Sequence, residues 1–382
     1  MNAQMFDRSE VAGTLKPLDE ATWLTQRAYT DPAIYDVENE RIFLKEWMAV
    51  FHHTTLPNIG DYRTMDIAGK PLLFVRDQER RIRCYINVCR HRGMAIAKGN
   101  GNCYGFVCPY HTWSYDLDGK VIATPQIKGN WAKGGVRLTE VRTEIYVGYL
   151  FISFDTSATS VAERLGGVAT DLKAWNDADL EVLFEKTYVC RWNWKLMWEN
   201  GIEAYHVLGI HRESVHTHIP SEKAYVTAPD SEANYVILHT PYQDTGSNAF
   251  GAQAEAIPTI PNLPAWTAKE SRFYTFWPIS QFSTGTESLN GFFVLPGPSI
   301  DEHLVVWTMA VSRKAKQHPK YEAYKAEQIA YGDRIMDEDL PPCERIERTY
   351  KTCTDWIPGP YSYTEKPCWN FHHWYLKRLG IR

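Results

Sequence analysis

Several features that mark other protein classes are missing from this 382-residue sequence. It has no block of basic residues and a formal net charge of −5, which argues against nucleic acid as a partner. No run of about 18 apolar residues is present, so no membrane span is expected. The first residues, MNAQMFDRSEVAGTLK, lack the apolar stretch of a secretory signal. These absences favour a cytoplasmic globular protein.

Cysteine is present, but not in the pattern of a small disulfide-bonded protein. The eight cysteines are spread from Cys84 to Cys368. A chain of this length does not need disulfides to fold, and it shows no export signal, so reduced thiols are the better interpretation.

Hydrophobic periodicity divides the chain into three predicted parts. Residues 1–40 form a helical segment that packs on the C-terminal domain, residues 41–155 a small all-β domain, and residues 156–382 that C-terminal α+β domain, with an antiparallel sheet covered by helices. Pro341-Pro342 should separate two helices, at 319–338 and 343–352. Further expectations are a helical patch over 36–51, one strand over 145–155, a hairpin about Asp118-Gly119 and a long loop over 246–266.

A first group of possible metal ligands consists of Cys89-x-His91 and Cys108-x-x-His111. A zinc site, a four-cysteine site that includes Cys84 and Cys103, and a two-iron cluster with two histidines in place of two cysteines are all compatible with these residue types. Each pair offers one thiol and one imidazole. Two loops could therefore each give a thiolate to one iron and an imidazole to the other, which favours the two-iron cluster.

A second group of possible ligands lies in residues 193–218. Two histidines and one carboxylate around a metal with open positions are typical of non-haem Fe(II) sites that react with O₂. Glu203 and His206 are three residues apart and are expected on one helix face. His206 and His211 are five apart, so they converge only if the helix ends between them, for example at Gly209. The stretch also contains Glu199, Asn200, His216 and His218, and the last two are rival ligands.

The motifs C-x-H-R-G and C-P-Y-H-x-W, followed by E-N-x-x-E-x-Y-H-x4-H, resemble those of the large (α) subunits of Rieske non-haem iron oxygenases, the ring-hydroxylating oxygenase family. The resemblance implies a [2Fe–2S] Rieske cluster, with Cys89 and Cys108 on one iron and His91 and His111 on the other. It also implies a mononuclear Fe(II) that activates O₂. The implied fold is an N-terminal all-β Rieske domain followed by a catalytic domain of the helix-grip, START-like type.

The same resemblance implies roles for individual residues. His206 and His211 correspond to iron ligands, and Glu203 to the acid that bridges the iron site and a Rieske histidine of the neighbouring subunit. Asn200 and Tyr205 occupy positions near the iron. The family carries a Glu-Asp pair before a final helix, which makes Asp339 the expected third ligand, with Asp337 as the alternative. Most relatives have Asp at the bridge, and a Glu there is known among relatives that oxidise quaternary ammonium compounds. His372 and His373 are expected on the surface or in packing.

The expected function is the terminal oxygenase component of a multicomponent system, hydroxylating an aromatic substrate with electrons from NAD(P)H. No G-x-G-x-x-G stands at a strand–helix junction, so a separate reductase is expected as a partner, with or without a ferredoxin. The family implies a homotrimer with C₃ symmetry and leaves a β subunit possible. The alternatives are a monooxygenase or N-demethylase for a betaine- or carnitine-like quaternary ammonium compound, a Rieske electron carrier without oxygenase activity, and a zinc-stabilised interaction protein.

Overall fold

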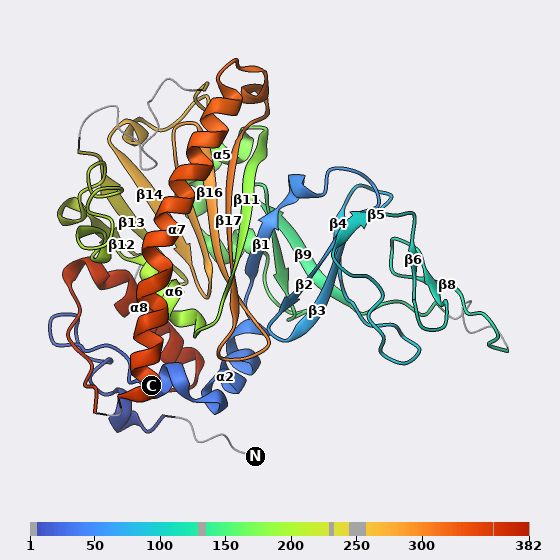
Figure 1. The fold of residues 1–382 in the computed structure, drawn as a ribbon, viewed down its shortest axis with the longest axis horizontal. Coiled ribbons are helices and arrows are strands. Elements are labelled where there is room, and N and C mark those ends of the chain that lie inside the picture. The colour runs from blue at the N-terminus through green and yellow to red at the C-terminus, as the bar shows by residue number, and fades with distance from the viewer. Residues whose placement is uncertain (1–5, 129–134, 229–232, 244–256, 354, 382) are drawn as a thin grey trace.

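The computed structural model of the chain describes residues 6–128, 135–228, 233–243, 257–353 and 355–381. An N-terminal β-rich region and a larger C-terminal sheet lie side by side, with the long helix α7 on the side of the C-terminal sheet (Figure 1). Within these residues, no helix combines the length and the apolar character that crossing a membrane requires.

The N-terminal region contains a seven-stranded and a three-stranded antiparallel sheet in the part of the chain that is described. The order in the larger sheet is β1-β10-β9-β4-β3-β2-β5, and in the smaller one β6-β7-β8. The strands are β1 (Met48–His52), β2 (Asp61–Ile67), β3 (Lys70–Arg76), β4 (Ile82–Ile86), β5 (Asn100–Asn102), β6 (Phe106–Val107), β7 (Ser114–Tyr115), β8 (Val121–Ala123), β9 (Glu140–Tyr146) and β10 (Tyr149–Ser153).

Three predictions can be compared with these strands. The hairpin about Asp118-Gly119 is confirmed, because β7 and β8 flank it and pair. The single strand over 145–155 is wrong, since β9 and β10 form a hairpin whose turn residues, Val147 and Gly148, both have positive φ. The helical patch over 36–51 is also wrong in its second half. A helix ends at Phe43, and the apolar MAVFH becomes β1, buried against the C-terminal sheet.

The C-terminal region is built on one antiparallel sheet with the strand order β11-β17-β16-β15-β14-β13-β12. The long strands are rich in β-branched and aromatic residues, which suit a pleated, buried surface. The strands are β11 (Leu180–Cys190), β12 (Tyr225–Thr227), β13 (Tyr235–Pro241), β14 (Glu270–Phe276), β15 (Ser280–Thr284), β16 (Ser288–Pro296) and β17 (His303–Ser312).

The two regions pack together through β1 on one side and β16 and β17 on the other. Tyr149 OH donates a hydrogen bond to Leu289 O at 3.1 Å and accepts one from Thr308 Oγ1 at 2.9 Å. Gly291 lies at this contact, where a Cβ atom would come within 2.7 Å of the Tyr149 ring. Because helices cover the other face of the sheet, β16 and β17 are buried on both faces and read as nearly continuous apolar runs.

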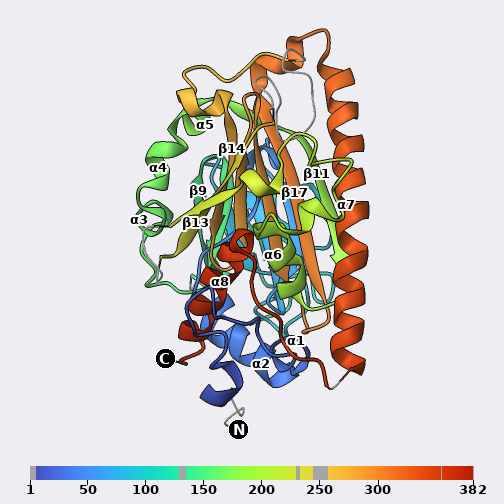
Figure 2. The same ribbon diagram turned by 90° about the vertical axis from the view of Figure 1, so that its left-hand side faces the viewer.

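Helices cover the outer face of the C-terminal sheet. Figure 2 shows α6 and α8 in front of the strands and α7 running beside them near β11. The helices are α1 (Arg27–Thr30), α2 (Pro32–Glu38), α3 (Val161–Leu165), α4 (Val168–Asp171), α5 (Lys173–Asp177), α6 (Trp194–Ile202), α7 (Tyr321–Thr352) and α8 (Lys366–Arg378). Short 3₁₀ and π turns are Arg8–Val11, Asn39–Phe43, His53–Thr55, His206–Leu208, Ser221–Lys223, Ala265–Ala268, Arg313–Gln317 and Tyr363–Glu365.

The predicted break at Pro341-Pro342 is wrong, because α7 continues through both prolines. The two residues lack the N–H groups that would bond to carbonyls one turn earlier, which normally ends a helix. Burial against the rest of the protein outweighs this cost. One stripe of buried positions, spaced by three or four residues, passes the prolines without interruption: Tyr321, Tyr324, Gln328, Gly332, Met336, Asp339, Cys343 and Glu347.

The described part of the N-terminal segment packs on α6. Tyr29 OH donates to Glu199 Oε1 at 2.9 Å, and Lys195 Nζ donates to Glu38 Oε1 at 2.5 Å, both without exposure to solvent. These contacts agree with a segment that docks on the C-terminal region, although the boundaries 1–40, 41–155 and 156–382 remain predictions. Residues 246–256 of the expected loop over 246–266 lie outside the described residues.

Candidate metal centres

Two tight turns carry the paired cysteines and histidines. In the turn after β4, Gly93 N donates to Cys89 O at 3.0 Å, and in the turn after β6, Thr112 N donates to Cys108 O at 3.0 Å. Gly93 and Thr112 both have positive φ, 80° and 57°, which closes each loop. The two loops therefore present their cysteine and histidine in corresponding positions.

The ligand atoms of these loops suit a metal cluster. Cys89 and Cys108 are only 3% and 1% exposed. The Nδ1 atoms of His91 and His111 face each other at 3.1 Å. Two nitrogens about 2.0–2.1 Å from one tetrahedral metal lie about 3.3 Å apart. The two imidazoles are therefore placed as ligands of a common metal, and the donor set of two thiols and two imidazoles fits a Rieske cluster.

The spacing of the four groups argues against a single zinc ion. Four ligands of one tetrahedral metal all lie within about 4 Å of one another. In the described residues, the paired cysteines and histidines form no group of three or more ligand atoms within 4.8 Å. The four ligands span a larger volume than one ion occupies, as two bridged irons require.

Aromatic residues support these loops. The Trp113 ring is stacked on His91, with centroids 5.0 Å apart and 10° between planes. Tyr115 OH accepts a hydrogen bond from Arg90 N at 3.0 Å and lies 3.1 Å from Cys89 Sγ, so its proton is free to be donated to the sulfur. Sequence reasoning missed Tyr115, because no spacing pattern links it to Cys89.

The second group begins where α6 ends. Asn193 caps the helix by accepting a hydrogen bond from Lys195 N at 3.0 Å, and the last helical residue is Ile202. Glu203 follows in an extended conformation, with φ −119° and ψ 176°. Its carboxylate accepts the His206 N–H at 3.2 Å and faces His206 Nδ1 at 2.5 Å. The prediction that Glu203 and His206 share a helix face is wrong. The two residues lie instead in a turn that follows the helix, where the Glu203 carboxylate accepts a hydrogen bond from the backbone N–H of His206.

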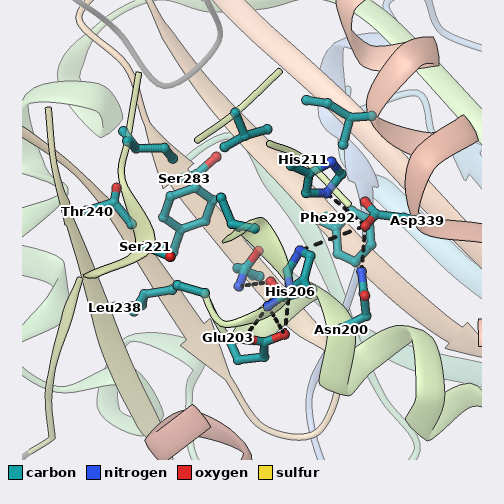
Figure 3. A pocket seen from close by; sticks show the side chains of 18 of the residues that line it. Asn200, Glu203, His206, His211, Ser221, Leu238, Thr240, Ser283, Phe292 and Asp339 are labelled. Atoms are coloured by element: carbon teal, nitrogen blue, oxygen red, sulfur yellow. Dashed lines mark hydrogen bonds and ion pairs between the residues drawn. The ribbon is translucent and has the colours of Figure 1, made fainter. Parts of the chain in front are cut away.

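Three predicted ligands converge at one point (Figure 3). His211 Nε2 lies 2.9 Å and His206 Nε2 3.8 Å from Asp339 Oδ1, and the three ligand atoms all lie within 4.8 Å of one another. The histidines come from the turns after α6 and the aspartate from the middle of α7. This set of two imidazoles and one carboxylate suits Fe(II) with open positions.

A neighbouring side chain orients each of the three predicted ligands. Glu203 Oε1 faces His206 Nδ1, and Glu338 Oε2 lies 2.6 Å from His211 Nδ1. When each Nδ1 carries a proton for its carboxylate, each Nε2 keeps a lone pair for a metal. Asn200 Nδ2 donates to Asp339 Oδ1 at 2.8 Å.

Further groups position Glu338. Ser214 Oγ donates to Glu338 Oε2 at 2.5 Å, and Arg334 Nε donates to its Oε1 at 3.0 Å. Sequence reasoning placed Glu338 in the Glu-Asp pair but missed its contact with His211, because a separation of 127 residues leaves no local signal.

The charges around the two imidazoles favour a cation. Burial lowers the pKa of His206, but the carboxylates of Glu203 and Asp339 outweigh it and raise that pKa to about 9. Burial also lowers the pKa of His211, but Asp339 and Glu338 outweigh this effect and raise that pKa above its usual value. Carboxylates that stabilise a proton here would equally stabilise a divalent metal in its place.

Other predicted residues lie away from this point. Tyr205 is 54% exposed and is not among the described residues that line the adjoining cavity. Asp337 is exposed on α7, and His216 accepts from Ser221 N at 3.3 Å instead of joining the three ligands. His372 is fully buried and bonds to Glu199 Oε1 at 2.8 Å, which agrees with packing but not with a surface position.

A cavity adjoins the three residues. Its volume is about 130 Å³. Apolar side chains from α6, the turns after it, α7 and the sheet form most of the wall, and Ser221, Thr240 and Ser283 lie across the cavity from Asp339 (Figure 3). The arrangement places a metal-ligand group at one end of an apolar pocket.

Comparison with known families agrees with this geometry. Residues 46–142 match the Rieske [2Fe-2S] domain, and residues 178–381 match the ring hydroxylating alpha subunit (catalytic domain). The chain belongs to the family of ring-hydroxylating alpha subunits with a Rieske domain. The two matches imply a Rieske [2Fe–2S] cluster and a mononuclear iron that works with O₂.

Among proteins of known function, the chain is 35% identical over 192 residues to the carnitine monooxygenase oxygenase subunit of Escherichia coli (strain K12), covering 49% of this chain and 51% of that protein. It is 33% identical over 212 residues to the anthranilate 1,2-dioxygenase large subunit of Acinetobacter baylyi, covering 53% and 45%. The chain spans about half the length of the curated relatives it matches.

Solved structures share the fold over nearly the whole chain. The quaternary ammonium Rieske monooxygenase involved in carnitine oxidation by gut microbiota superposes with a TM-score of 0.79 at 21% identity, covering 98% of this chain and 99% of that one. Naphthalene 1,2-dioxygenase with bound indole gives a TM-score of 0.74 at 20% identity, covering 99% and 95%. At these identities the likeness shows the fold alone.

Proposed function

We propose that the chain is the terminal oxygenase component of a Rieske system, which hydroxylates a small aromatic molecule with O₂. The observation that carries the proposal is the convergence of His206, His211 and Asp339 at the end of an apolar cavity. The same chain carries two loops whose thiols and imidazoles suit a redox cluster.

The proposal assigns His206, His211 and Asp339 to the mononuclear iron, and Cys89, His91, Cys108 and His111 to the cluster. The iron supplies O₂ activation at positions that the protein leaves open. The chain's own residues orient and insulate that site. Glu203 and Glu338 fix the two imidazoles, Asn200 holds the carboxylate of Asp339, and the apolar wall excludes water from the substrate.

The electron path is proposed to cross between subunits. In one chain, β6, which leads into Cys108, lies at the opposite end of the molecule from α6, which leads into Glu203 (Figure 1). A head-to-tail ring of three chains would bring His111 of one copy to Glu203 of the next, with Glu203 as the bridge. A separate NAD(P)H-dependent reductase, with or without a ferredoxin, would reduce the cluster. A β subunit, where one exists, would bind to the ring of three chains.

Iron content and oxygen uptake together test this proposal. The wild-type chain should hold about three irons, and His206→Ala about two, because the cluster does not depend on His206. The variant should keep the visible absorption of the cluster and lose substrate-dependent oxygen uptake. His218→Ala is the matched control, since His218 is outside the group of three ligands, and should behave as wild type.

A His206→Ala chain with unchanged iron content would leave only a Rieske electron carrier, and a colourless wild-type protein would favour the zinc alternative.

A quaternary ammonium compound is the second candidate substrate. Glu203 at the bridge position, the rings of Phe273, Phe292 and Trp307 in the cavity wall and the similarity to a carnitine monooxygenase favour it. Oxygen uptake with choline-like compounds against neutral aromatic compounds separates the two classes.

A further inference from the structure

The described lining residues of the cavity include no arginine or lysine that could hold an anion. The two histidines among them are the proposed iron ligands. Segments 229–232 and 244–256, which lie outside the described residues and adjoin β13 in sequence, contain no arginine or lysine either. Basic residues on neighbouring elements are engaged elsewhere: Arg272 with Glu270 at 2.7 Å, Arg334 with Glu338 at 3.0 Å, and Lys223 with Gln243 at 2.8 Å.

The acidic side chains of the cavity are also engaged. Glu203 faces His206 Nδ1, and Asp339 Oδ1 lies next to His211 Nε2 and accepts the Asn200 amide. No carboxylate among the described lining residues is left to neutralise a cationic substrate. The described wall is therefore uncharged at every position that the proposed iron site does not use.

The polar groups of the wall are neutral hydrogen-bonding groups. Ser221, Thr240 and Ser283 lie across the cavity from Asp339 (Figure 3). Asn290 also lines the cavity and is 2% exposed. Its Nδ2 faces Ser283 O at 3.4 Å, and its Oδ1, which is shielded from solvent, has no hydrogen-bond partner within the part of the chain that the structure describes. The hydroxyl of Thr240 donates to a main-chain carbonyl, so it offers acceptor positions to a ligand. A substrate N–H or O–H would satisfy such acceptors.

Resting on the function proposed above, we infer that the substrate is an uncharged aromatic molecule with an N–H or O–H substituent, and that carboxylates and sulfonates are rejected. An anion that enters this cavity leaves water and meets no cationic side chain among the described lining residues. The carboxylates of Glu203, Glu338 and Asp339 offset the charge of an iron held at the site, so burial of the anion is unfavourable. An amide of the same shape loses much less hydration and can bond to the neutral wall. Selectivity then comes from the missing cation and not from the size of the cavity.

Matched pairs of small molecules test the inference on the iron-loaded full chain. The pairs are anthranilate with 2-aminobenzamide, and 2-aminobenzenesulfonate with 2-aminobenzenesulfonamide, which differ mainly in charge. The dissociation constant by calorimetry and the substrate-dependent oxygen uptake should both favour the neutral member by at least about 100-fold. A pair in which the anion binds as well as the neutral compound overturns the inference, and so does a panel in which no neutral member binds.

A charged wall should weaken the preference for the neutral compound. Ser283→Lys places an ammonium group on the wall across from Asp339 and should tighten anthranilate relative to 2-aminobenzamide by about tenfold or more. Ser283→Met, of similar length and without charge, is the matched control and should leave the ratio unchanged. A lysine variant with the wild-type ratio would contradict the inference.

Failure of this inference and failure of the proposed function give different results. If the anions are the better substrates, oxygen uptake and the iron loss in His206→Ala still support the oxygenase. If His206→Ala keeps its iron, the oxygenase proposal fails whatever the pairs show.

Discussion

At the scale of the residue, the proposed iron site depends on carboxylates that face the Nδ1 atoms of two imidazoles, on the side away from the metal position. Glu203 holds His206 and Glu338 holds His211. Motif spacing could predict the first pair, because its members are three residues apart. The second pair joins α7 to the turns after α6 and could only be found in the folded chain. The family resemblance already favoured Asp339 over Asp337, and the helical rotation of α7 buries the first and exposes the second.

A buried histidine at the contact between the two regions gives the protein a pH-dependent stability. Burial, together with the nearby positive charges of His53 and Arg313, lowers the pKa of His52 from 6.5 to about 3. The folded state therefore keeps His52 neutral while the unfolded chain binds a proton. The contribution to stability is fully present above about pH 6.5 and is lost as the pH falls towards about 3, by at most about 1.4 kcal/mol per pH unit.

The variant His52→Gln should remove this part of the pH dependence. Between pH 6.5 and pH 4.5, the melting temperature of the wild type should fall more steeply than that of the variant. His318→Gln is the control, because His318 is only partly buried at the start of the segment before α7. Equal slopes in the wild type and His52→Gln would contradict the assignment.

At the scale of the element, sheets and helices follow the burial pattern more closely than the local propensities. The sequence Pro341-Pro342 predicts a helix end. The helix α7 nevertheless continues through both prolines, because its stripe of buried residues is continuous. The local sequence around MAVFH predicts a helix. The segment instead forms β1, because it packs against β16 and β17 of the C-terminal sheet. Both errors arise from contacts with segments distant in sequence, which periodicity does not report. Most strands of the C-terminal sheet could be predicted, because their apolar runs are long and bounded by turns.

At Gly291 the two sheets approach so closely that a larger residue would clash with its neighbours. A Cβ atom there would lie 2.5 Å from Phe293 Cζ and 2.7 Å from Tyr149 Cε1. Gly291→Ala should lower the free energy of unfolding by about 1–3 kcal/mol, the usual cost of overpacking a core. Gly167→Ala is the control, since no atom lies within 4 Å of its Cβ position and its φ is negative. Denaturant titration compares the two, and equal midpoints would show that the sheets can move apart at no cost.

At the scale of the whole molecule, one chain combines a Rieske domain with a catalytic domain, and the two lie side by side (Figure 1). The cofactors and the family could be predicted from short motifs, because Cys/His pairs and the two-histidine segment constrain chemistry directly. The character of the cavity could not be predicted, because its wall is assembled from α6, the turns after it, α7 and the strands β13–β17, and no single stretch of sequence contains it. The assembly that would join the two ends of neighbouring chains remains a proposal.

The central claim is that Glu203 carries electrons from the cluster of one chain to the iron of another. The most direct measurement is the rate at which a pre-reduced cluster is reoxidised, followed by its absorption after mixing with O₂ and substrate. Glu203→Gln should keep about three irons per chain, and its cluster should stay reduced while that of wild type is reoxidised. Glu213→Gln, an exposed acid in the same segment, should behave as wild type. Reoxidation of the Glu203→Gln cluster at the wild-type rate would contradict the claim.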